Sequence, residues 1–455
     1  MSCCIAAVAT GGGVSAIGIV RMSGDGAISA ADGLFTASGG VRLTDAEDRR
    51  LYYGELRDAD GSLIDLCLCT VSRGPNSYTG EDTVEFHCHG SPVVLSEALA
   101  ALRSRGARPA EAGEFTKRAF LNGRMDLTRA EAVIDLIEAE TAWAAKNAAA
   151  QLKGSLGVKL DSVYDGLLDV MAHFHAAIDY PDEDVDDFSM AAHAQALHSA
   201  KIELERILAT YERGKVMRDG VPTAIIGRPN TGKSSLLNAL LGYDRAIVAR
   251  TAGTTRDTIE EKAIIGGVLL RLTDTAGLRE TEDEVERLGV ERAVLALRGT
   301  GLAILVLDGS EELRDGDFEA LRAIPDGVPK LAVVNKSDLT RAIGDDELDS
   351  LGIESCRVSA LTGDGLDTLD GMIEKMFPEQ GTAPGEALTN ARHAGVISRA
   401  LGCISRAIDA IGASVTPDAV LTEVEAALLA IGEATGRTMR EDVTDRIFER
   451  FCVGK

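Results

Sequence analysis

The signals that would send this 455-residue chain to a membrane or out of the cell are missing from its sequence. Its first residues carry no basic segment, and three glycines at 11–13 interrupt the apolar stretch that follows, so we expect no signal peptide. No run of about 18 apolar residues occurs, so no membrane span is expected. The eight cysteines follow no zinc or disulfide spacing, and Cys67-Leu68-Cys69 reads as a buried strand. We therefore expect a cytoplasmic protein with no membrane association.

The sequence also lacks an excess of positive charge. Its 47 Lys and Arg residues stand against 72 Asp and Glu residues, which gives a formal net charge of −25 at pH 7. Such a chain is not expected to hold nucleic acid through a broad basic face, although a basic partner could carry the nucleic acid. Hydrophobic residues make up 45% and charged residues 26%, the balance of a globular protein. The length predicts several domains.

Strand signals dominate the first 120 residues. Segments 16–22 and 65–72 are mostly apolar, whereas 83–89 alternates between polar and apolar residues. Turn signals such as Asp60-Gly61 lie between them. We therefore expect a mixed α/β domain over residues 1–120.

Helical periodicity begins at about residue 128. We predict one long Ala-rich helix over 128–149, with Thr128 as its N-cap and Glu131 completing a capping box. A second helix carries apolar residues from 160 to 174, and a third covers about 191–214. These three helices predict an all-α region after the α/β domain.

Residues 222–377 alternate between strands and helices, which predicts a parallel sheet with covering helices. Five strands are expected, at 223–226, 268–273, 302–307, 331–334 and 356–358. The tail beyond residue 388 is again helical, with an apolar stripe of Leu421, Val424, Leu428, Leu429 and Ile431. We therefore predict one helical domain made of two segments, 121–218 and 379–455. A domain of residues 219–378 is inserted between them.

A phosphate-binding loop follows the first strand of this inserted domain. Residues 227–234 read Gly-Arg-Pro-Asn-Thr-Gly-Lys-Ser, which matches the P-loop pattern without gaps. Its glycines allow backbone N–H groups to surround phosphate oxygens. Lys233 is expected to reach the outer phosphates and Ser234 to ligate Mg²⁺. The N-terminus of the following helix adds a favourable dipole.

Four further motifs follow in the order expected of a Ras-like GTPase. Thr255 is expected to be the second Mg²⁺ ligand, and the motif at 274–277 supplies a carboxylate near the ion. In the motif at 335–338, the Asp338 carboxylate can accept two N–H bonds that guanine donates and adenine does not. A loop at 359–361 closes over the base. The expected GTP-binding residues are Asn230, Thr231, Gly232, Lys233, Ser234, Ser235, Ala249, Thr251, Thr254, Thr255, Asp274, Thr275, Ala276, Gly277, Asn335, Lys336, Asp338, Ser359, Ala360 and Leu361.

One position departs from many small GTPases. Leu278 stands where they place the Gln that orients water, and no intrinsic arginine finger is evident. We expect K⁺ to supply the missing charge, bound by the Asn230 side chain and by carbonyls of the loop 249–254. Glu286 is a candidate to position water, although a surface charge fits its spacing equally well. The expected K⁺ ligands are Asn230, Ala249, Thr251 and Thr254, and the expected catalytic residues are Glu286, Lys233 and Thr255.

Taken together, these motifs resemble the MnmE (TrmE) family of tRNA-modification GTPases. In the nucleotide domain the resemblance rests on segments 227–235, 253–257 and 274–280. Outside that domain it rests on segments 75–82, 85–90, 113–115, 119–127 and 441–455, with the ending Phe451-Cys-Val-Gly-Lys455. The resemblance therefore covers almost the whole chain.

The resemblance implies three domains and a partner. Residues 1–120 would bind folate and dimerise, and a discontinuous helical domain would carry the inserted G domain. The homodimer would form a heterotetramer with the flavoprotein MnmG, which carries FAD. Together they would build an aminomethyl-type group on C5 of the wobble uridine of certain tRNAs from a folate one-carbon unit. The tRNA would be held mainly by the partner.

The resemblance also implies the folate contacts. Arg21, Glu85, Arg124 and Lys455 match family positions that bind a tetrahydrofolate derivative. Glu85 would pair with the pterin, and the cations with the glutamate tail. Arg124 stands where the family often has Lys, which keeps the charge but changes its shape. Cys452 matches a near-terminal Cys of the family, placed either near the folate or inside a helix.

Other interpretations stay open at this point. A ribosome-assembly-type GTP-binding switch shares the P-loop region but not the N-terminal motifs or the chain ending. A folate-dependent one-carbon transferase, with GTP as a regulator, would act without a flavoprotein. His87 and His89 share a strand face with Glu85, so a metal site there is a further alternative. The segment 10–15 departs from the loop usual in the family.

Overall fold

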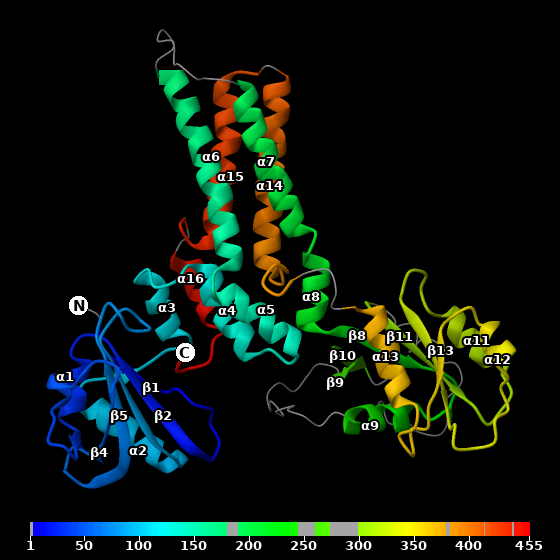
Figure 1. Ribbon diagram of the computed structural model, residues 1–455, viewed down its shortest axis with the longest axis horizontal. Helices are drawn as coiled ribbons and strands as arrows, with labels where there is room; N and C mark the ends of the chain where they lie inside the picture. The colour runs from blue at the N-terminus through cyan, green and yellow to red at the C-terminus, as the bar shows by residue number, and fades with distance from the viewer. Residues whose placement is uncertain are drawn as a thin grey trace. The chain divides into compact units, whose positions relative to one another are not determined.

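The computed structural model describes residues 3–179, 190–243, 260–273, 299–378, 383–413, 415–438 and 441–455. Within it the chain divides into two compact units. The first comprises Met1–Ile134, Gln151–Lys201 and Val396–Lys455, and the second comprises Asp135–Ala150 and Ile202–Gly395. Sheets and helices occur in both, as the ribbon in Figure 1 shows, so the prediction of a multidomain protein with α/β and all-α parts is confirmed.

The first unit begins with a seven-stranded sheet in the order β3-β4-β5-β6-β2-β1-β7. Neighbouring strands are antiparallel except β1 and β7, which run parallel. The strands are β1 (Ile5–Val8), β2 (Ser15–Ser23), β3 (Phe35–Ala37), β4 (Leu51–Arg57), β5 (Leu63–Ser72), β6 (Thr83–Gly90) and β7 (Arg108–Pro109). The three strands predicted from the sequence correspond to β2, β5 and β6.

Helices α1 (Ala27–Asp32) and α2 (Pro92–Ser104) pack with one face of this sheet into a single core, and a short 3₁₀ helix spans Leu43–Asp45. Side chains along a strand alternate between the two faces. On β5, Cys67 and Cys69 are buried, whereas Leu66 and Leu68 are 43% and 36% exposed. The expected buried strand around Cys67 is therefore confirmed, and the opposite face of the sheet carries exposed apolar side chains.

The prediction of one helix over 128–149 is wrong, because two helices cover this region. Asp126, rather than Thr128, caps the first of them, since its carboxylate accepts the Arg129 N–H at 2.9 Å. The chain breaks before Thr141, whose hydroxyl accepts the Ala144 N–H at 3.1 Å and caps the second. The helices of this region are α3 (Glu114–Leu121), α4 (Leu127–Ile137), α5 (Ala142–Leu152), α6 (Ser155–Asp179), α7 (Met190–Leu208) and α8 (Tyr211–Asp219).

The third predicted helix, at 191–214, is likewise divided, because α7 ends at Leu208 and α8 begins at Tyr211. After the second unit the chain returns in α14 (Ala391–Gly412), α15 (Pro417–Thr435) and α16 (Glu441–Phe448). Within the first unit, α6, the first part of α7, most of α14 and α15 run side by side (Figure 1). Segments far apart in the sequence thus form one helical bundle, as predicted.

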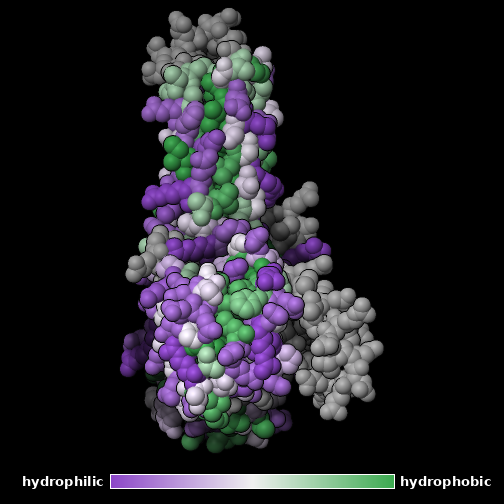
Figure 2. Space-filling model, turned by 90° about the vertical axis from the view of Figure 1, so that its right-hand side faces the viewer, coloured by the Kyte–Doolittle hydropathy of each residue, from purple (hydrophilic) through white to green (hydrophobic). Residues whose placement is uncertain are grey.

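The apolar stripe of α15 is narrower than the sequence suggested. Leu421, Val424, Leu428 and Ile431 are buried, but Leu429 is 58% exposed. Its neighbour Leu428 already occupies the buried face of the helix, and consecutive residues point in different directions. In the space-filling view of Figure 2, hydrophobic side chains along the bundle lie between hydrophilic ones. Among the helices of the described residues, none has the length and hydropathy needed to cross a bilayer.

The second unit contains a six-stranded sheet in the order β13-β12-β11-β8-β10-β9. Its strands run parallel except β9, which pairs antiparallel with β10 at the edge. The strands are β8 (Val221–Ile226), β9 (Glu260–Ile265), β10 (Val268–Thr273), β11 (Leu302–Asp308), β12 (Lys330–Asn335) and β13 (Ser355–Arg357). All five predicted strands are present. The sequence analysis missed β9, although Gly266-Gly267, both with positive φ, is a hairpin signal.

Helices cover both faces of this sheet. Leucines of α9 (Lys233–Tyr243) and apolar residues of α13 (Leu366–Met376) join one core. Residues of α11 (Asp315–Arg322) and α12 (Asp345–Asp349) join the core on the other face. Because both faces are covered, the central strands are mostly apolar, and every residue of β11 is buried. Ligand-binding loops of such a sheet gather at the carboxyl ends of its strands.

Candidate functional site

The P-loop leaves the carboxyl end of β8 at residue 227, a position that only glycine can occupy. Its φ is +147°, and a Cβ there would lie 2.3 Å from the Val306 carbonyl oxygen. The loop then leads directly into α9, whose first residues are Lys233, Ser234 and Ser235. The two serines are exposed on the first helical turn. The strand, glycine loop and helix N-terminus predicted for a phosphate site are therefore arranged as expected.

Within the loop, Lys233 is held by backbone oxygens. Its ammonium donates to the Gly227 carbonyl at 3.0 Å and to the Arg228 carbonyl at 2.7 Å. The buried Thr231 hydroxyl donates to the same Arg228 carbonyl at 3.0 Å. Asn230 is exposed and adopts the left-handed conformation, with φ of 64°. Such conformations of residues other than glycine gather at functional sites.

Asn335, at the end of β12, links the P-loop to the base-binding loops. Its Nδ2 donates to the Thr231 carbonyl at 3.1 Å, and its Oδ1 accepts the Ala360 N–H at 3.0 Å. A Cβ on Gly232 would lie 2.1 Å from that Nδ2, so the close approach requires glycine. The Ser359 hydroxyl donates to Asp338 Oδ1 at 2.6 Å. Residues of three separate motifs are thus brought into one site, with Leu361 85% exposed at its edge.

Asp308 is part of this site although the sequence analysis did not select it. Its carboxylate accepts bonds from Lys336 Nζ at 2.5 Å and from the Ser310 hydroxyl at 2.6 Å. Burial by itself raises the pKa of Asp308, but the bonds from Lys336 and Ser310 outweigh it and leave the pKa below its ordinary value. Its position in the sequence could have identified it, because Asp308 ends a buried strand of the parallel sheet. The neighbouring strand, β12, leads directly to Lys336.

A cavity of about 160 Å³ lies beside these loops. Its lining residues are Arg228, Pro229, Asn230, Thr231, Asp308, Glu311, Arg314 and Lys336. The cavity thus joins the P-loop to the loop that follows β11 and to the base motif. Several predicted residues lie outside the described part of the chain, namely Ala249, Thr251, Thr254, Thr255, Asp274, Thr275, Ala276, Gly277 and Glu286.

In the N-terminal domain, Arg21 and Glu85 face each other across β2 and β6. Arg21 Nε donates to Glu85 Oε1 at 2.7 Å. The guanidinium carbon also lies 5.6 Å from the ring centres of Tyr78 and Phe115, within the range of cation–π contact. The side chains of the ion pair are 17% and 25% exposed, so the pair remains accessible.

The end of the chain reaches the same place. The Gly454 carbonyl lies 3.5 Å from Arg21 Nη1, and Phe115 N–H donates to the Lys455 carbonyl at 3.2 Å. Cys452 is exposed and lies outside any helix, so the alternative of a buried helix residue is wrong. Arg124 Nε donates to the Ser77 carbonyl at 3.1 Å, next to Tyr78. All five predicted folate residues therefore lie on segments that contact this one region.

The two histidines of β6, His87 and His89, lie near different carboxylates. His89 Nδ1 bonds to Asp65 Oδ1 at 2.8 Å, and His87 Nε2 lies 3.5 Å from Glu85 Oε2. Across the described ranges, His, Cys, Asp and Glu side chains form no group of three suited to hold a metal ion. The geometry of the described residues thus gives no support to the alternative of a metal site on this strand.

Comparison with known proteins covers both units. The family model described as the MnmE helical domain matches residues 127–452, and the one described as the GTP-binding protein TrmE N-terminus matches residues 4–124. Proteins named tRNA modification GTPase MnmE from Alkaliphilus metalliredigens (strain QYMF) and Heliobacterium modesticaldum (strain ATCC 51547 / Ice1) are 42% and 43% identical to this chain. Each alignment covers 99% of this chain and 99% of the relative.

Among solved structures, the G domain of the T. maritima FeoB iron transporter is 28% identical, over 34% of this chain and 96% of that one. The TM-score of 0.25 is too low to support a conclusion about this fold. The two family models and the full-length relatives agree with the motifs and with the P-loop geometry. The chain therefore belongs to the MnmE (TrmE) family of tRNA modification GTPases, and it hydrolyses GTP in tRNA modification.

Proposed function

We propose that this GTPase is stimulated by K⁺ and acts with the FAD-carrying flavoprotein MnmG. Together they install an aminomethyl-type group on C5 of the wobble uridine of certain tRNAs, using a one-carbon unit of a tetrahydrofolate derivative. We also propose a cytoplasmic location. The proposed domains are residues 1–120, the helical segments 121–218 and 379–455, and the G domain 219–378. The observation that carries the K⁺ proposal is the geometry of Asn230.

Asn230 is suited to bind a cation. Its left-handed backbone places it at the exposed tip of the P-loop, directly beside Thr231 and the phosphate-binding turn. An amide oxygen is a ligand that hard cations accept. We propose that carbonyls of Ala249, Thr251 and Thr254 complete the K⁺ site, and that Ser234 and Thr255 ligate Mg²⁺. The positive charge would stabilise the transition state as an arginine finger does in other GTPases.

GTP turnover in KCl and in NaCl, at equal ionic strength and with Mg²⁺ present, tests this proposal. Faster hydrolysis in KCl is expected for the wild type. The variant Asn230→Ala should lose that difference while still binding GTP, because Lys233 and the base motif remain. Equal rates for the wild type would contradict the cation proposal and favour a GTP-binding switch of the ribosome-assembly type.

We propose that Glu286 positions the attacking water, since Leu278 cannot. The variant Glu286→Ala should keep its affinity for GTP and lose about 100-fold in kcat, the lower end of what a positioned acid or base contributes. Single-turnover hydrolysis and equilibrium binding of a GTP analogue measure the two quantities separately. Unchanged turnover would show that Glu286 is an ordinary surface charge with no role in hydrolysis.

For folate, we propose that Glu85 pairs with the pterin and that Arg21, Arg124 and Lys455 attract the glutamate tail. Support comes from the accessible ion pair of Arg21 and Glu85, since the guanidinium also lies close to the aromatic rings of Tyr78 and Phe115. Cys452 is exposed two residues before Gly454, whose carbonyl lies near Arg21. Charged groups of both signs near aromatic rings suit a ligand with a flat heterocycle and an anionic tail.

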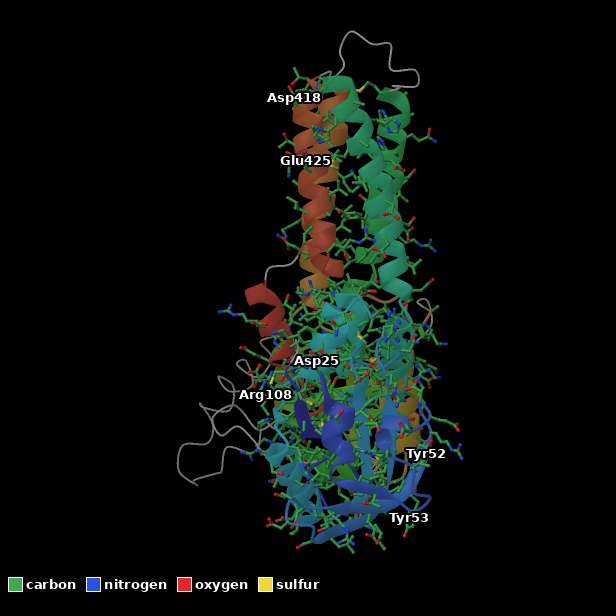
Figure 3. The ribbon with its side chains drawn as sticks, turned by 90° about the vertical axis from the view of Figure 1, so that its left-hand side faces the viewer. Asp25, Tyr52, Tyr53, Arg108, Asp418 and Glu425 are labelled. Atoms are coloured by element: carbon green, nitrogen blue, oxygen red, sulfur yellow. The ribbon has the colours of Figure 1, made fainter. Side chains whose placement is uncertain are left out.

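We propose a homodimer formed through the N-terminal domain. The face of its sheet that α1 and α2 leave open carries exposed apolar side chains: Ile17, Leu51, Tyr53, Leu66 and Leu68 are 59%, 50%, 53%, 43% and 36% exposed. Tyr53 lies opposite Leu68 in the register of β4 and β5, and Figure 3 labels it beside Tyr52. An apolar patch of this kind marks an interface. Leu68→Glu should shift the protein toward the monomer in light scattering, whereas an unchanged mass would exclude this face.

The heterotetramer with MnmG and the handling of tRNA are also proposals. The net charge of −25 suits a chain that leaves most of the tRNA contact to a more basic partner. Purified chain without MnmG should therefore bind tRNA weakly. Mixing the two proteins and measuring the molar mass of the complex by light scattering tests the heterotetramer directly.

A further inference from the structure

Arg228, the second residue of the P-loop, is tied to the start of α11, whose N-cap Arg314 lines the same cavity. Its Nε donates to Asp317 Oδ1 at 2.8 Å. The Asp317 side chain is 1% exposed and that of Arg228 is 16% exposed, so the pair is largely removed from water. Arg228 Nη2 also lies 3.7 Å from Glu311 Oε2, which is more exposed. The pair with Asp317 is therefore the main anchor of this guanidinium.

The start of α11 is shaped to receive Arg228. The second oxygen of Asp317 accepts the Arg314 N–H at 3.0 Å and so caps the helix. Gly316, which lies between Arg314 and Asp317 in the sequence, leaves room for the Arg228 side chain, because a Cβ there would lie 3.0 Å from Arg228 Cδ. One carboxylate thus serves the helix with one oxygen and the P-loop with the other.

On its other side, Arg228 holds the phosphate-binding lysine. Its backbone carbonyl accepts bonds from Lys233 Nζ at 2.7 Å and from the Thr231 hydroxyl at 3.0 Å. A continuous chain of contacts therefore runs from α11 through Asp317 and Arg228 to Lys233. Moving the Arg228 side chain would move the carbonyl that orients the lysine.

We propose that Asp317 is a positioning residue for GTP binding, which holds the P-loop in its binding-competent form through Arg228. Without the Asp317 charge, the largely buried guanidinium of Arg228 keeps only its longer approach to Glu311, and the loop samples other conformations. The apparent affinity for nucleotide falls in proportion to the competent fraction. Once nucleotide is bound, the phosphates themselves order the loop, so kcat stays unchanged.

The first test is Asp317→Asn, which keeps the size of the side chain and removes its charge. Dissociation constants for fluorescent GDP and GTP analogues should rise about tenfold, if the competent fraction falls to about a tenth. The kcat at saturating GTP should stay within about twofold of the wild type. The expected change is therefore in binding and KM and not in the chemical step.

Glu347→Gln is the matched control. Glu347 occupies the same capping position of α12 and accepts the Gly344 N–H at 2.7 Å, but it has no contact with a nucleotide loop in the described structure. Both variants lose a capping carboxylate, but only Asp317→Asn also removes the buried partner of Arg228, so its melting temperature is expected to drop more than that of this control. If Asp317→Asn loses stability like this control but keeps its nucleotide affinity, Asp317 is only a helix cap and the proposal is overturned.

A double-mutant cycle isolates the tether itself. Arg228→Gln leaves the cap of α11 intact, so it tests the proposal even if Asp317→Asn folds poorly. Alone, it should weaken nucleotide binding about as much as Asp317→Asn, and the double variant should be no weaker than either. Arg228→Gln with unchanged affinity, additive losses in the double variant, or a kcat that falls together with kcat/KM would each contradict the proposal.

Discussion

The two ligand sites proposed for this chain are built in different ways. The nucleotide site collects short motifs at the carboxyl ends of strands in a mainly parallel sheet, such as the P-loop after β8 and Asn335 at the end of β12. The N-terminal site instead pairs Arg21 with Glu85 across two antiparallel strands, and it takes Gly454 from the other end of the chain.

This difference explains why the sequence alone identifies the nucleotide site but not the N-terminal site. At the carboxyl edge of a parallel sheet, a motif carries its own loop geometry, so residue order is enough to identify it. Charges on antiparallel strands acquire a role only from strand register and from the segments that pack over them. By themselves, Arg21 and Glu85 resemble an ordinary salt bridge of a sheet.

The largest expected effect is in the motif-built site. Asp338→Ala should weaken GTP binding about 100-fold or more, because two hydrogen bonds to a charged acceptor are lost. Folate binding should not change. Equilibrium binding of GTP and ATP measures the effect, and Asp346→Ala, an exposed acid of the same domain, is the control. A variant that still prefers GTP over ATP would show that base recognition does not depend on this motif.

The next effect tests the contribution of the chain end to the assembled site. Gly454 has φ of +98°, and a Cβ there would lie 2.3 Å from the Val8 carbonyl oxygen. Gly454→Ala should therefore displace the tail at a cost of about 2 kcal/mol and reduce folate affinity. Gly26→Ala is matched in φ, at +80°, but meets no atom within 4 Å. Equal folate affinity for both variants would exclude the tail from the site.

A smaller effect is expected from the ion pair itself. Glu85→Gln should weaken binding of a reduced folate about tenfold, the loss of one hydrogen bond to a charged group. GTP turnover should remain unchanged. Glu55→Gln is the control, since Glu55 pairs with Arg57 at 2.6 Å on the same sheet, away from Arg21. If both variants bind folate like the wild type, the proposed pterin contact is wrong.

The smallest effect concerns the support of α3, which carries Phe115. Glu114 pairs with Arg108 and Arg118; burial by itself raises its pKa, but these bonds outweigh it and leave the pKa below its ordinary value of 4.5. Glu114→Gln should cost only about 1 kcal/mol, because Arg118 keeps its bond to Glu81.

The sign of this contribution gives a pH test. A lowered pKa in the folded state stabilises the fold above the ordinary pKa, and this stabilisation is lost as pH falls through the lowered value. Wild type and Glu114→Gln should therefore differ in melting temperature near neutral pH and converge as the pH falls through the lowered pKa of Glu114. If the difference in melting temperature persists in acid, the loss of stability in Glu114→Gln comes from packing rather than from the lost charge.

The sequence determined most strands of the nucleotide domain, although it missed the edge strand β9. All five predicted strands are present, because buried parallel strands are mostly apolar and bounded by turn residues. The motifs at 227–234 and 335–338 identify their chemistry by spacing alone. By contrast, Asp308 and Asp317 were missed, because a lone Asp has no motif. The division of the helix at 128–149 was missed because helical periodicity continues across the break.

What only the tertiary structure decided is which distant groups meet. The sequence marks Lys233 as a phosphate ligand, but only the fold shows that Arg228 and Asp317 connect it to α11. The same is true of Arg21, whose partners Glu85 and Gly454 are brought to it by strand register and by the path of the tail. Local propensity and spacing act along the chain, whereas burial and ion pairing depend on the distances that packing sets.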